Sequence, residues 1–310
     1  MTSLDELNTR FAIHGHARFD QVAPGMIVLQ LASVASDATI HLQGAHVTHW
    51  APRGADPVLF LSPKALFAPG KAIRGGVPLL FPWFGPRWDA ATFDAAHGTN
   101  SPAHGFARTA VWTVDAVTRH DDGSLSAVFS LAPDAVSRAL GYDHFAARLT
   151  CRIGRTLHVG LEVDNRGDVP MTYEDGLHTY FAVADLAPVR LEGLHGATYL
   201  DKRDGSRRKV DDERRFAFTR DVDRTYVNTD ATVAIHDPAN RRTIYLDKHG
   251  SNTTVVWNPA PLLTPNFADL ADDSWRRFVC VETVNSNDNR LQLAPGRSHT
   301  TAMTVRVEAG

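Results

Sequence analysis

Two ionisable side chains interrupt apolar segments that lie far apart along the chain. His178 lies in the segment Gly-Leu-His-Thr-Tyr-Phe, and Glu282 lies in the segment Phe-Val-Cys-Val-Glu-Thr. A single histidine in such a pattern is usually a hydrogen-bonded core residue, and a carboxylate there costs free energy unless it is paired or its raised pKa is useful. Because two such side chains occur on separate predicted strands, His178 and Glu282 are a candidate pair for general acid–base catalysis.

A second group of residues could hold an anion. Arg74 precedes two glycines, so a ligand oxyanion could approach the backbone while the guanidinium donates two hydrogen bonds. Alone, this triplet is more typical of a tight turn with a solvated arginine. Residues 77–85 follow with prolines and aromatic rings that could form a shaped wall or belong to the core. His104 and Arg108, in His-Gly-Phe-Ala-Arg, add an imidazole and a second guanidinium, or are ordinary surface residues.

Other candidate sites carry less chemical information. Asp223 could accept hydrogen bonds from ligand hydroxyl groups, or it could pair with the adjacent Arg224. The 15 histidines suggest a metal site, but the sequence has neither His-Glu-x-x-His nor Cys-x-x-Cys, and His46 and His49 would point to opposite faces of a strand. Gly-x-Gly-x-x-Gly, the Walker loop and Gly-x-Ser-x-Gly are also absent. We therefore expect no metal ion and no organic cofactor.

These side chains must be positioned by β-strands, because short runs rich in β-branched and aromatic residues fill most of the chain. Strands are expected at residues 26–31, 38–42, 45–50, 111–114, 125–129, 145–153, 157–163, 171–173, 232–236, 243–246, 253–257 and 300–307. Hairpin signals separate several of these runs, and helical patterns between them are scarce. We predict an all-β protein, a large antiparallel β-sandwich with few short helices that forms a single domain over residues 1–310.

Three short helices and one long loop complete the predicted fold. Ser3 and Glu6 form a possible capping box for an opening helix. Residues 133–140 and 266–275 are the other two helical candidates. Residues 82–105 are rich in glycine, proline and aromatic side chains and are expected to form a long loop, the kind of segment that often carries function on a rigid sheet.

Composition excludes several classes of protein. Hydrophobic residues make up 43% of the chain and charged residues 22%, which is typical of a globular protein with a sizeable core. The formal charge of −3 provides no broad positive surface for nucleic acid or an anionic membrane. The acidic N-terminus and the lack of a long apolar run predict neither a signal peptide nor a membrane span. With only two cysteines, we expect a cytoplasmic protein, and we expect it to be a monomer.

Five segments occur in the order seen in the glucose-6-phosphate 1-epimerases, a branch of the aldose 1-epimerase superfamily, at comparable intervals. They are residues 71–85, 104–108, 177–181, 223–226 and 279–282. The chain resembles these hexose-6-phosphate mutarotases along nearly its whole length. The resemblance implies the galactose mutarotase-like β-sandwich with a concave sugar site, and a small sugar phosphate as the binding partner.

The resemblance also implies a reaction and its catalytic pair. Glu282 would be the general base that removes the proton of the C1 hydroxyl group, and His178 would be the general acid that protonates the ring oxygen. The open aldehyde would then rotate and close on its other face, which interconverts the α and β anomers. For this cycle, His178 must begin protonated and Glu282 ionised, which predicts a bell-shaped pH dependence.

The remaining roles concern binding. Arg74 and Arg108 are implied to be ligand-binding arginines, and Asp223 is implied to contact sugar hydroxyl groups. His104 matches a histidine that lines the sugar site in the wider superfamily. The sequence departs from these epimerases at Ala103, where they commonly have glutamine. The methyl group of alanine cannot make the polar contact that a glutamine side chain can make.

Several alternatives stay open at this stage. Residues 87–101 look longer than in these epimerases, so mannose or galactose 6-phosphate could replace glucose 6-phosphate as the substrate. Lys71 and Arg87 are further cations that could join the anion site. A non-catalytic carbohydrate-binding or sugar-phosphate-sensing protein on the same fold is the leading alternative function. Glycoside hydrolysis ranks lower, because it normally uses two carboxylates.

Overall fold

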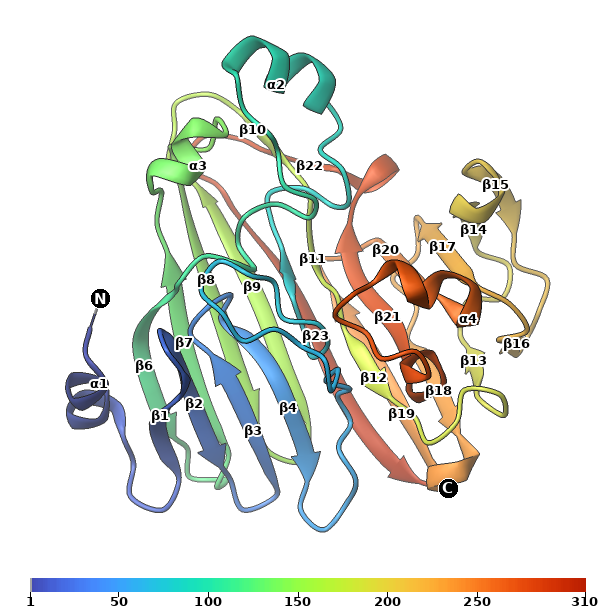
Figure 1. The fold of residues 1–310 in the computed structure, drawn as a ribbon, viewed down its shortest axis with the longest axis horizontal. Helices are drawn as coiled ribbons and strands as arrows, with labels where there is room; N and C mark the ends of the chain where they lie inside the picture. The colour runs from blue at the N-terminus through green and yellow to red at the C-terminus, as the bar shows by residue number, and fades with distance from the viewer. Residues whose placement is uncertain (1) are drawn as a thin grey trace.

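The computed structural model describes residues 2–310, and antiparallel β-sheets dominate it (Figure 1). The first sheet, at the N-terminal end of the chain, has four strands in the order β1 (Ala17–Ala23), β2 (Met26–Ala32), β3 (Ser36–His41) and β4 (His46–Pro52). Strands β2, β3 and β4 confirm the strands predicted at residues 26–31, 38–42 and 45–50.

The largest sheet has nine strands and runs through both halves of the chain. Its order is β16 (Phe216–Ala217), β13 (Arg190–Glu192), β18 (Val233–Asp237), β19 (Arg242–His249), β23 (Ser298–Ala309), β9 (Leu157–Asn165), β8 (Phe145–Ile153), β7 (Leu125–Leu131) and β6 (Thr113–Arg119). Along β8, alternate side chains are buried from Phe145 to Ile153, which is the period of two expected for a strand with one face on the core. The strand predicted at 111–114 starts at Thr113 and extends to Arg119.

The third sheet has eight strands and carries most of the candidate site. Its order is β15 (Arg207–Val210), β14 (Thr198–Asp201), β17 (Val222–Val227), β20 (Thr253–Asn258), β21 (Phe278–Asn285), β11 (Asp175–Leu177) and β5 (Leu79–Leu80), with β12 (Tyr180–Ala182) also paired to β21. A separate pair joins β10 (Met171–Tyr173) to β22 (Leu291–Leu293).

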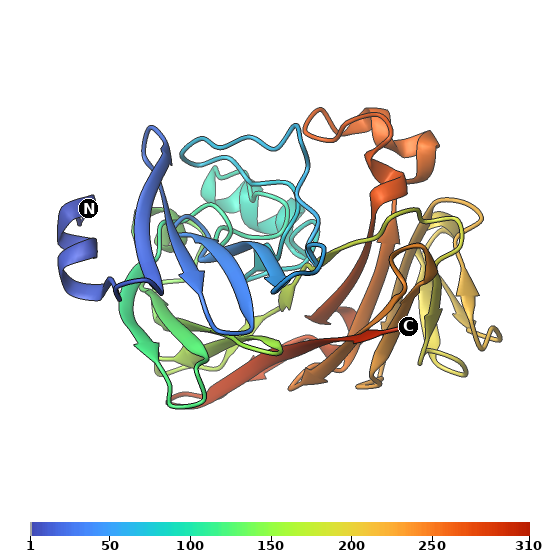
Figure 2. The same ribbon diagram turned by 90° about the horizontal axis from the view of Figure 1, so that it is seen from below.

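The sheets pack into a sandwich, as Figure 2 shows from below. Strand β8 of the nine-stranded sheet contacts β3 of the first sheet, and β23 contacts β21 and β11 of the third. One continuous apolar cluster extends from Leu7 near the N-terminus to Val305 in β23. The predicted class, an all-β antiparallel sandwich with few short helices, is confirmed.

The structure also contains short α-helices and 3₁₀ turns between the strands. The α-helices are α1 (Leu4–Phe11), α2 (Ala90–His97), α3 (Ala135–Ala139) and α4 (Ala260–Leu263), and the 3₁₀ turns are η1 (Lys202–Asp204), η2 (Pro238–Asn240), η3 (Thr264–Asn266), η4 (Ser274–Arg277) and η5 (Asn287–Asn289). The capping box of α1 is confirmed, because the backbone N–H of Glu6 donates to Ser3 Oγ over 3.2 Å and the backbone N–H of Ser3 donates to the Glu6 carboxylate over 2.9 Å. Within residues 2–310, no helix is long and apolar enough to cross a membrane.

Two expectations about helices were wrong in part. Residues 82–105 are not only a loop, because α2 lies within them, at the top of Figure 1. No side chain of α2 is buried, so the helix leaves no apolar periodicity in the sequence. Residues 266–275 are not one helix. The helical turns are α4 before this range, η3 at its start and η4 at its end, and α4 and η3 each have a proline as their second residue, which suits the first turn.

Candidate active site

The structure brings His178 and Glu282 together on the third sheet. Glu282 lies in β21, in which every residue is buried. His178 is not inside a regular strand, as its sequence context suggested, but in the two-residue break between β11 and β12. Both of these short strands pair with β21 in one continuous register, which places His178 directly opposite Glu282. The Nε2 atom of His178 lies 3.4 Å from Oε1 of Glu282.

The surroundings of Glu282 disfavour its ionised form. Its side chain is 2% exposed, and its second oxygen, Oε2, is buried without a hydrogen-bond partner in the described residues. Burial raises the pKa of Glu282 well above its usual value, and the positive charge of Lys202 opposes this shift while the negative charge of Asp223 adds to it. A proton acceptor with a raised pKa is a stronger base once it is ionised.

The surroundings of His178 disfavour its charged form. Its side chain is 12% exposed, and its Nδ1 atom is buried with no hydrogen-bond partner in the part of the chain that the structure describes. Burial lowers the pKa of His178 well below its usual value, and repulsion from His104, Arg74 and Arg108 lowers it further. The two facing groups therefore favour a protonated carboxyl group and a neutral imidazole.

Aromatic rings fix the position of the His178 imidazole. The ring of Tyr180 stacks on it with centroids 4.9 Å apart and an angle of 8° between the planes. Trp257 and His104 approach it edge-on, at centroid distances of 6.2 and 5.7 Å. The imidazole is thus held on three sides, and its position relative to Glu282 is well defined.

A hydrogen bond from the backbone of Gly85 fixes the tautomer of His104. The backbone N–H of Gly85 donates to Nδ1 of His104 over 3.1 Å, so the ring proton of the neutral imidazole is on Nε2. Burial lowers the pKa of His104 to about 3, and the charges of Arg108, Lys202 and Arg74 act in the same direction. A neutral His104 can donate one hydrogen bond from Nε2 to a ligand oxygen.

Two hydrogen bonds and one aromatic ring hold the guanidinium group of Arg74 in place. Its Nε donates to Oδ1 of Asp269 over 3.1 Å, and its NH1 donates to the hydroxyl oxygen of Tyr180 over 3.0 Å. The guanidinium carbon also lies 5.1 Å from the centre of the Phe267 ring. Its side chain is 22% exposed, and its unused N–H groups remain available to a ligand.

Arg108 is the second cation and has no carboxylate partner among the ion pairs of the described residues. Its NH2 donates to the backbone carbonyl of Ala103 over 2.7 Å, and its Nε is buried without a partner. The contact to Ala103 uses the backbone, so the missing side-chain amide at this position does not release the arginine. Burial lowers the pKa of Arg108, and repulsion from Arg74 adds to that shift. An anion bound beside Arg108 would offset both the cost of burying its charge and the repulsion from Arg74.

Asp223 lies in β17 and is linked to a cation that the sequence did not single out. Lys202 Nζ lies 3.7 Å from Oδ1 of Asp223, and the same ammonium lies 4.4 Å from the centre of the Phe84 ring. Burial raises the pKa of Asp223, although Lys202 opposes the shift. The alternative pairing of Asp223 with Arg224 is not observed, because Arg224 turns to Asp211.

A metal-like cluster occurs within this site. Donor atoms of His178, Cys280 and Glu282 lie within 4.8 Å of one another. Tetrahedral Zn²⁺, with bonds of about 2.0 to 2.3 Å, would draw its ligands to within roughly 4 Å of each other, so the cluster would have to contract to hold one. Cys280 is buried beside Tyr180 and Phe278 in an apolar cluster, and burial raises its pKa well above the usual value.

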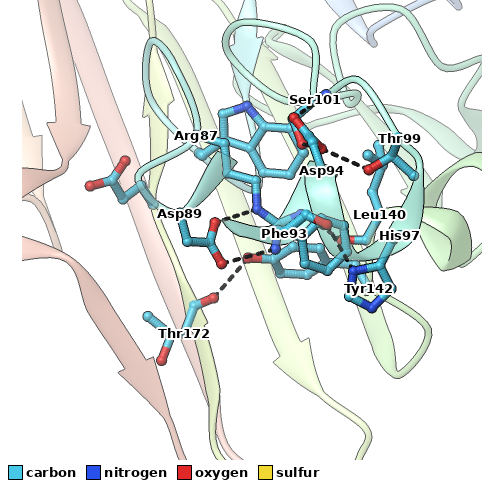
Figure 3. Close-up of polar contacts among 12 residues, drawn as sticks. Arg87, Asp89, Phe93, Asp94, His97, Thr99, Ser101, Leu140, Tyr142 and Thr172 are labelled. Carbon is cyan, nitrogen blue, oxygen red and sulfur yellow. Dashed lines mark hydrogen bonds and ion pairs between the residues drawn. The ribbon is translucent and has the colours of Figure 1, made fainter. Parts of the chain in front are cut away.

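Arg87 lies outside this group of residues. It pairs with Asp89, donates to the backbone carbonyl of Leu140 over 2.9 Å, and stacks on the rings of Trp83 and Phe93 (Figure 3). These contacts tie α2 to the sandwich. None of these contacts of Arg87 involves Arg74 or Arg108.

The turn that presents Arg74 requires glycine. Gly75 has φ +115°, and a Cβ there would lie 2.4 Å from the carbonyl oxygen of Phe60. We expect Gly75→Ala to reduce the free energy of unfolding by about 3 kcal/mol or more, from backbone strain plus overlap. Gly70 has φ +73° with nothing near its would-be Cβ, so Gly70→Ala should cost only about 1 kcal/mol. Urea unfolding of both variants measures the difference, and equal costs would contradict it.

A sandwich that buries a histidine and a carboxylate face to face, beside several cations, has the features of an enzyme that moves protons on a small anionic substrate. Residues 28–306 match the family model described as aldose 1-epimerase, and the chain belongs to that family. It is an epimerase, an enzyme of the isomerase class.

Known relatives agree with this assignment. The chain is 36% identical over 247 residues to a Salmonella typhimurium protein provisionally named glucose-6-phosphate 1-epimerase, covering 80% of this chain and 79% of that one. A protein of the same provisional name from Escherichia coli K12 is 34% identical over 270 residues, covering 87% and 86%. The crystal structure of a provisionally named mutarotase from Salmonella typhimurium superposes with a TM-score of 0.87 at 30% identity, covering 97% of this chain and 96% of that one. The resemblance stated from five segments is thereby confirmed.

Proposed function

We propose that the protein interconverts the α and β anomers of a hexose 6-phosphate, with glucose 6-phosphate as the first candidate. The observation that carries the proposal is the buried contact of 3.4 Å between His178 and Glu282 in the same sheet region as Arg74. The provisional names of the Salmonella and Escherichia relatives support the phosphorylated substrate. The unpaired guanidinium of Arg108 supports it independently, because a phosphate group would supply the missing partner.

The proposed mechanism needs only proton transfers. Glu282 takes the proton from the C1 hydroxyl group while His178 gives a proton to the ring oxygen, and the C1–O5 bond breaks to leave the open aldehyde. Rotation about C1–C2 presents the other face of the carbonyl group. The O5 hydroxyl then returns its proton to His178 as it attacks C1, and Glu282 reprotonates the new C1 hydroxyl group. Both residues end in the states in which they began.

Binding of the substrate's phosphate group also favours a protonated His178 and an ionised Glu282, the state in which this cycle begins. The positive charges of Arg74 and Arg108 repel a proton on His178. A phosphate dianion held by these arginines offsets their charge, so the proton moves more readily from Glu282 to His178. Asp223 and the Nε2–H group of His104 are proposed to hold the sugar hydroxyl groups.

The free enzyme should show a bell-shaped dependence of kcat/KM on pH, because the pair works with one shared proton. At low pH both groups are protonated, and activity rises as the first proton leaves with a pKa below the usual 6.5 of histidine. Activity falls again as the second proton leaves with a pKa above the usual 4.5 of glutamate. Initial anomerisation rates at low substrate concentration measure this. Activity that stays constant at both the acidic and the alkaline end of the pH range in which the protein remains folded would exclude the pair as the proton carriers.

Exchange NMR separates this proposal from its alternatives. Anomeric proton signals of glucose, mannose and galactose 6-phosphates are followed with and without the protein, together with methyl glucoside. An epimerase increases exchange between the two anomers of at least one hexose 6-phosphate. A non-catalytic binding protein broadens or shifts signals without exchange, and a glycosidase releases methanol. Either of the last two results would replace the proposed function.

We further propose that residues 1–310 act as one domain, as a cytoplasmic monomer. Both cysteines are buried and unpaired, which suits a reducing compartment. The shared apolar cluster, which joins side chains of the first and last strands, supports a single folding unit.

A further inference from the structure

Tyr180 links the anion-binding end of the site to the proposed acid, although no role was predicted for it. It is the first residue of β12 and is 2% exposed. Its ring stacks on the imidazole of His178, and its hydroxyl oxygen accepts a hydrogen bond from NH1 of Arg74. One side chain thus contacts both functional parts.

The hydroxyl hydrogen of Tyr180 has no acceptor in the described residues. A phenol group has one O–H donor beside its acceptor lone pairs, and among residues 2–310 the only hydrogen bond of the Tyr180 hydroxyl group is the one accepted from Arg74 over 3.0 Å. Burial raises the pKa of Tyr180 above its usual range, so the proton stays on the oxygen. A buried donor without an acceptor costs free energy, and an anion bound beside Arg74 would remove that cost.

We propose that Tyr180 is a third contact to the phosphate group of the substrate and also the residue that positions His178. The hydroxyl group donates to a phosphate oxygen beside the free N–H groups of Arg74, while the ring holds the imidazole against Glu282. This inference rests on the proposed function, because it assumes a phosphorylated substrate.

The competing explanation is that Tyr180 only fills space. Its ring also packs against Phe278, with centroids 5.2 Å apart, and it belongs to a small apolar cluster with Cys280. Packing alone predicts no loss when the hydroxyl group is removed and the ring is kept. The two explanations therefore differ most clearly in the variant Tyr180→Phe.

Two substitutions separate the hydroxyl group from the ring. Tyr180→Phe should raise the KM for glucose 6-phosphate and the inhibition constant of inorganic phosphate each by about tenfold, the usual effect of a hydrogen bond to a charged group. The KM for free glucose should change much less. Tyr180→Leu, which also removes the stacked ring, should in addition lower kcat for both sugars by at least about tenfold, because the imidazole loses its support. Tyr245→Phe, on β19 under Arg306 in the nine-stranded sheet, is the matched control.

The outcomes distinguish the inference from the proposed function. An unchanged KM for glucose 6-phosphate and unchanged phosphate inhibition in Tyr180→Phe would overturn the phosphate contact. A Tyr180→Leu variant with the kcat of Tyr180→Phe would overturn the positioning role. If the wild-type protein anomerises no hexose 6-phosphate, the proposed function fails, and calorimetry with inorganic phosphate still decides the contact: weaker binding to Tyr180→Phe supports it, and equal binding overturns it.

Discussion

Glu282→Gln is expected to lower kcat for anomerisation by about 10² to 10⁴, because the amide has nearly the shape of the carboxylate but cannot take the proton from the C1 hydroxyl group. Binding of the phosphorylated sugar should be nearly unchanged, since the proposed contacts to its phosphate group are at Arg74 and Arg108. The free energy of unfolding should stay the same or rise, because the substitution removes a buried ionisable group whose Oε2 has no partner.

Exchange NMR at saturating substrate gives kcat for this variant, and calorimetry gives its affinity. Glu162→Gln is a suitable control, because it makes the same chemical change on β9, in another sheet. A Glu282→Gln variant with near-wild-type exchange would show that Glu282 is not the base.

Arg74→Ala is expected to raise the KM for hexose 6-phosphate by about 100-fold, because it removes charged hydrogen bonds to the phosphate group. The KM for the free hexose should rise only a few-fold. Loss of the guanidinium also frees Asp269 and the hydroxyl group of Tyr180, which it holds at 3.1 and 3.0 Å. Arg74→Lys should be intermediate, since the charge remains but the planar pair of donors is lost.

Steady-state kinetics on both sugars provide the comparison. Arg18→Ala, which removes an exposed arginine of β1, controls for the general effect of losing a positive charge. Equal increases in KM for phosphorylated and free hexose would contradict the assignment of Arg74 to the phosphate group.

The sandwich could be predicted because the strands follow the burial pattern of their residues. Alternation along β8 and the apolar run from Phe278 to Val281 in β21 are both visible in the sequence. Helix α2 could not be predicted, because none of its side chains is buried. The prolines near α4 were visible, but their positions at the starts of helical turns depend on where the chain folds back.

The polar residues that interrupt apolar segments could be predicted as site residues, but the residues that hold the site in place could not. His178 and Glu282 stand out because polar residues rarely interrupt apolar strands. Asp269 and Lys202 carry no such signal: they lie in irregular or short helical segments, and only tertiary structure brings them to Arg74 and Asp223. Tyr180 does not stand out in the sequence, because an aromatic residue is expected in a buried strand. Only the contacts in the structure show that its hydroxyl hydrogen has no acceptor among the described residues.

The most direct test of the central claim is two-dimensional exchange NMR of glucose 6-phosphate and free glucose at equal concentrations, each with the same amount of wild-type protein. A hexose-6-phosphate epimerase built around His178 and Glu282 should accelerate exchange between the anomers of glucose 6-phosphate well above the spontaneous rate, and should act far more weakly on glucose. No acceleration with glucose, mannose or galactose 6-phosphate, or equal acceleration with the free and the phosphorylated sugar, would contradict it.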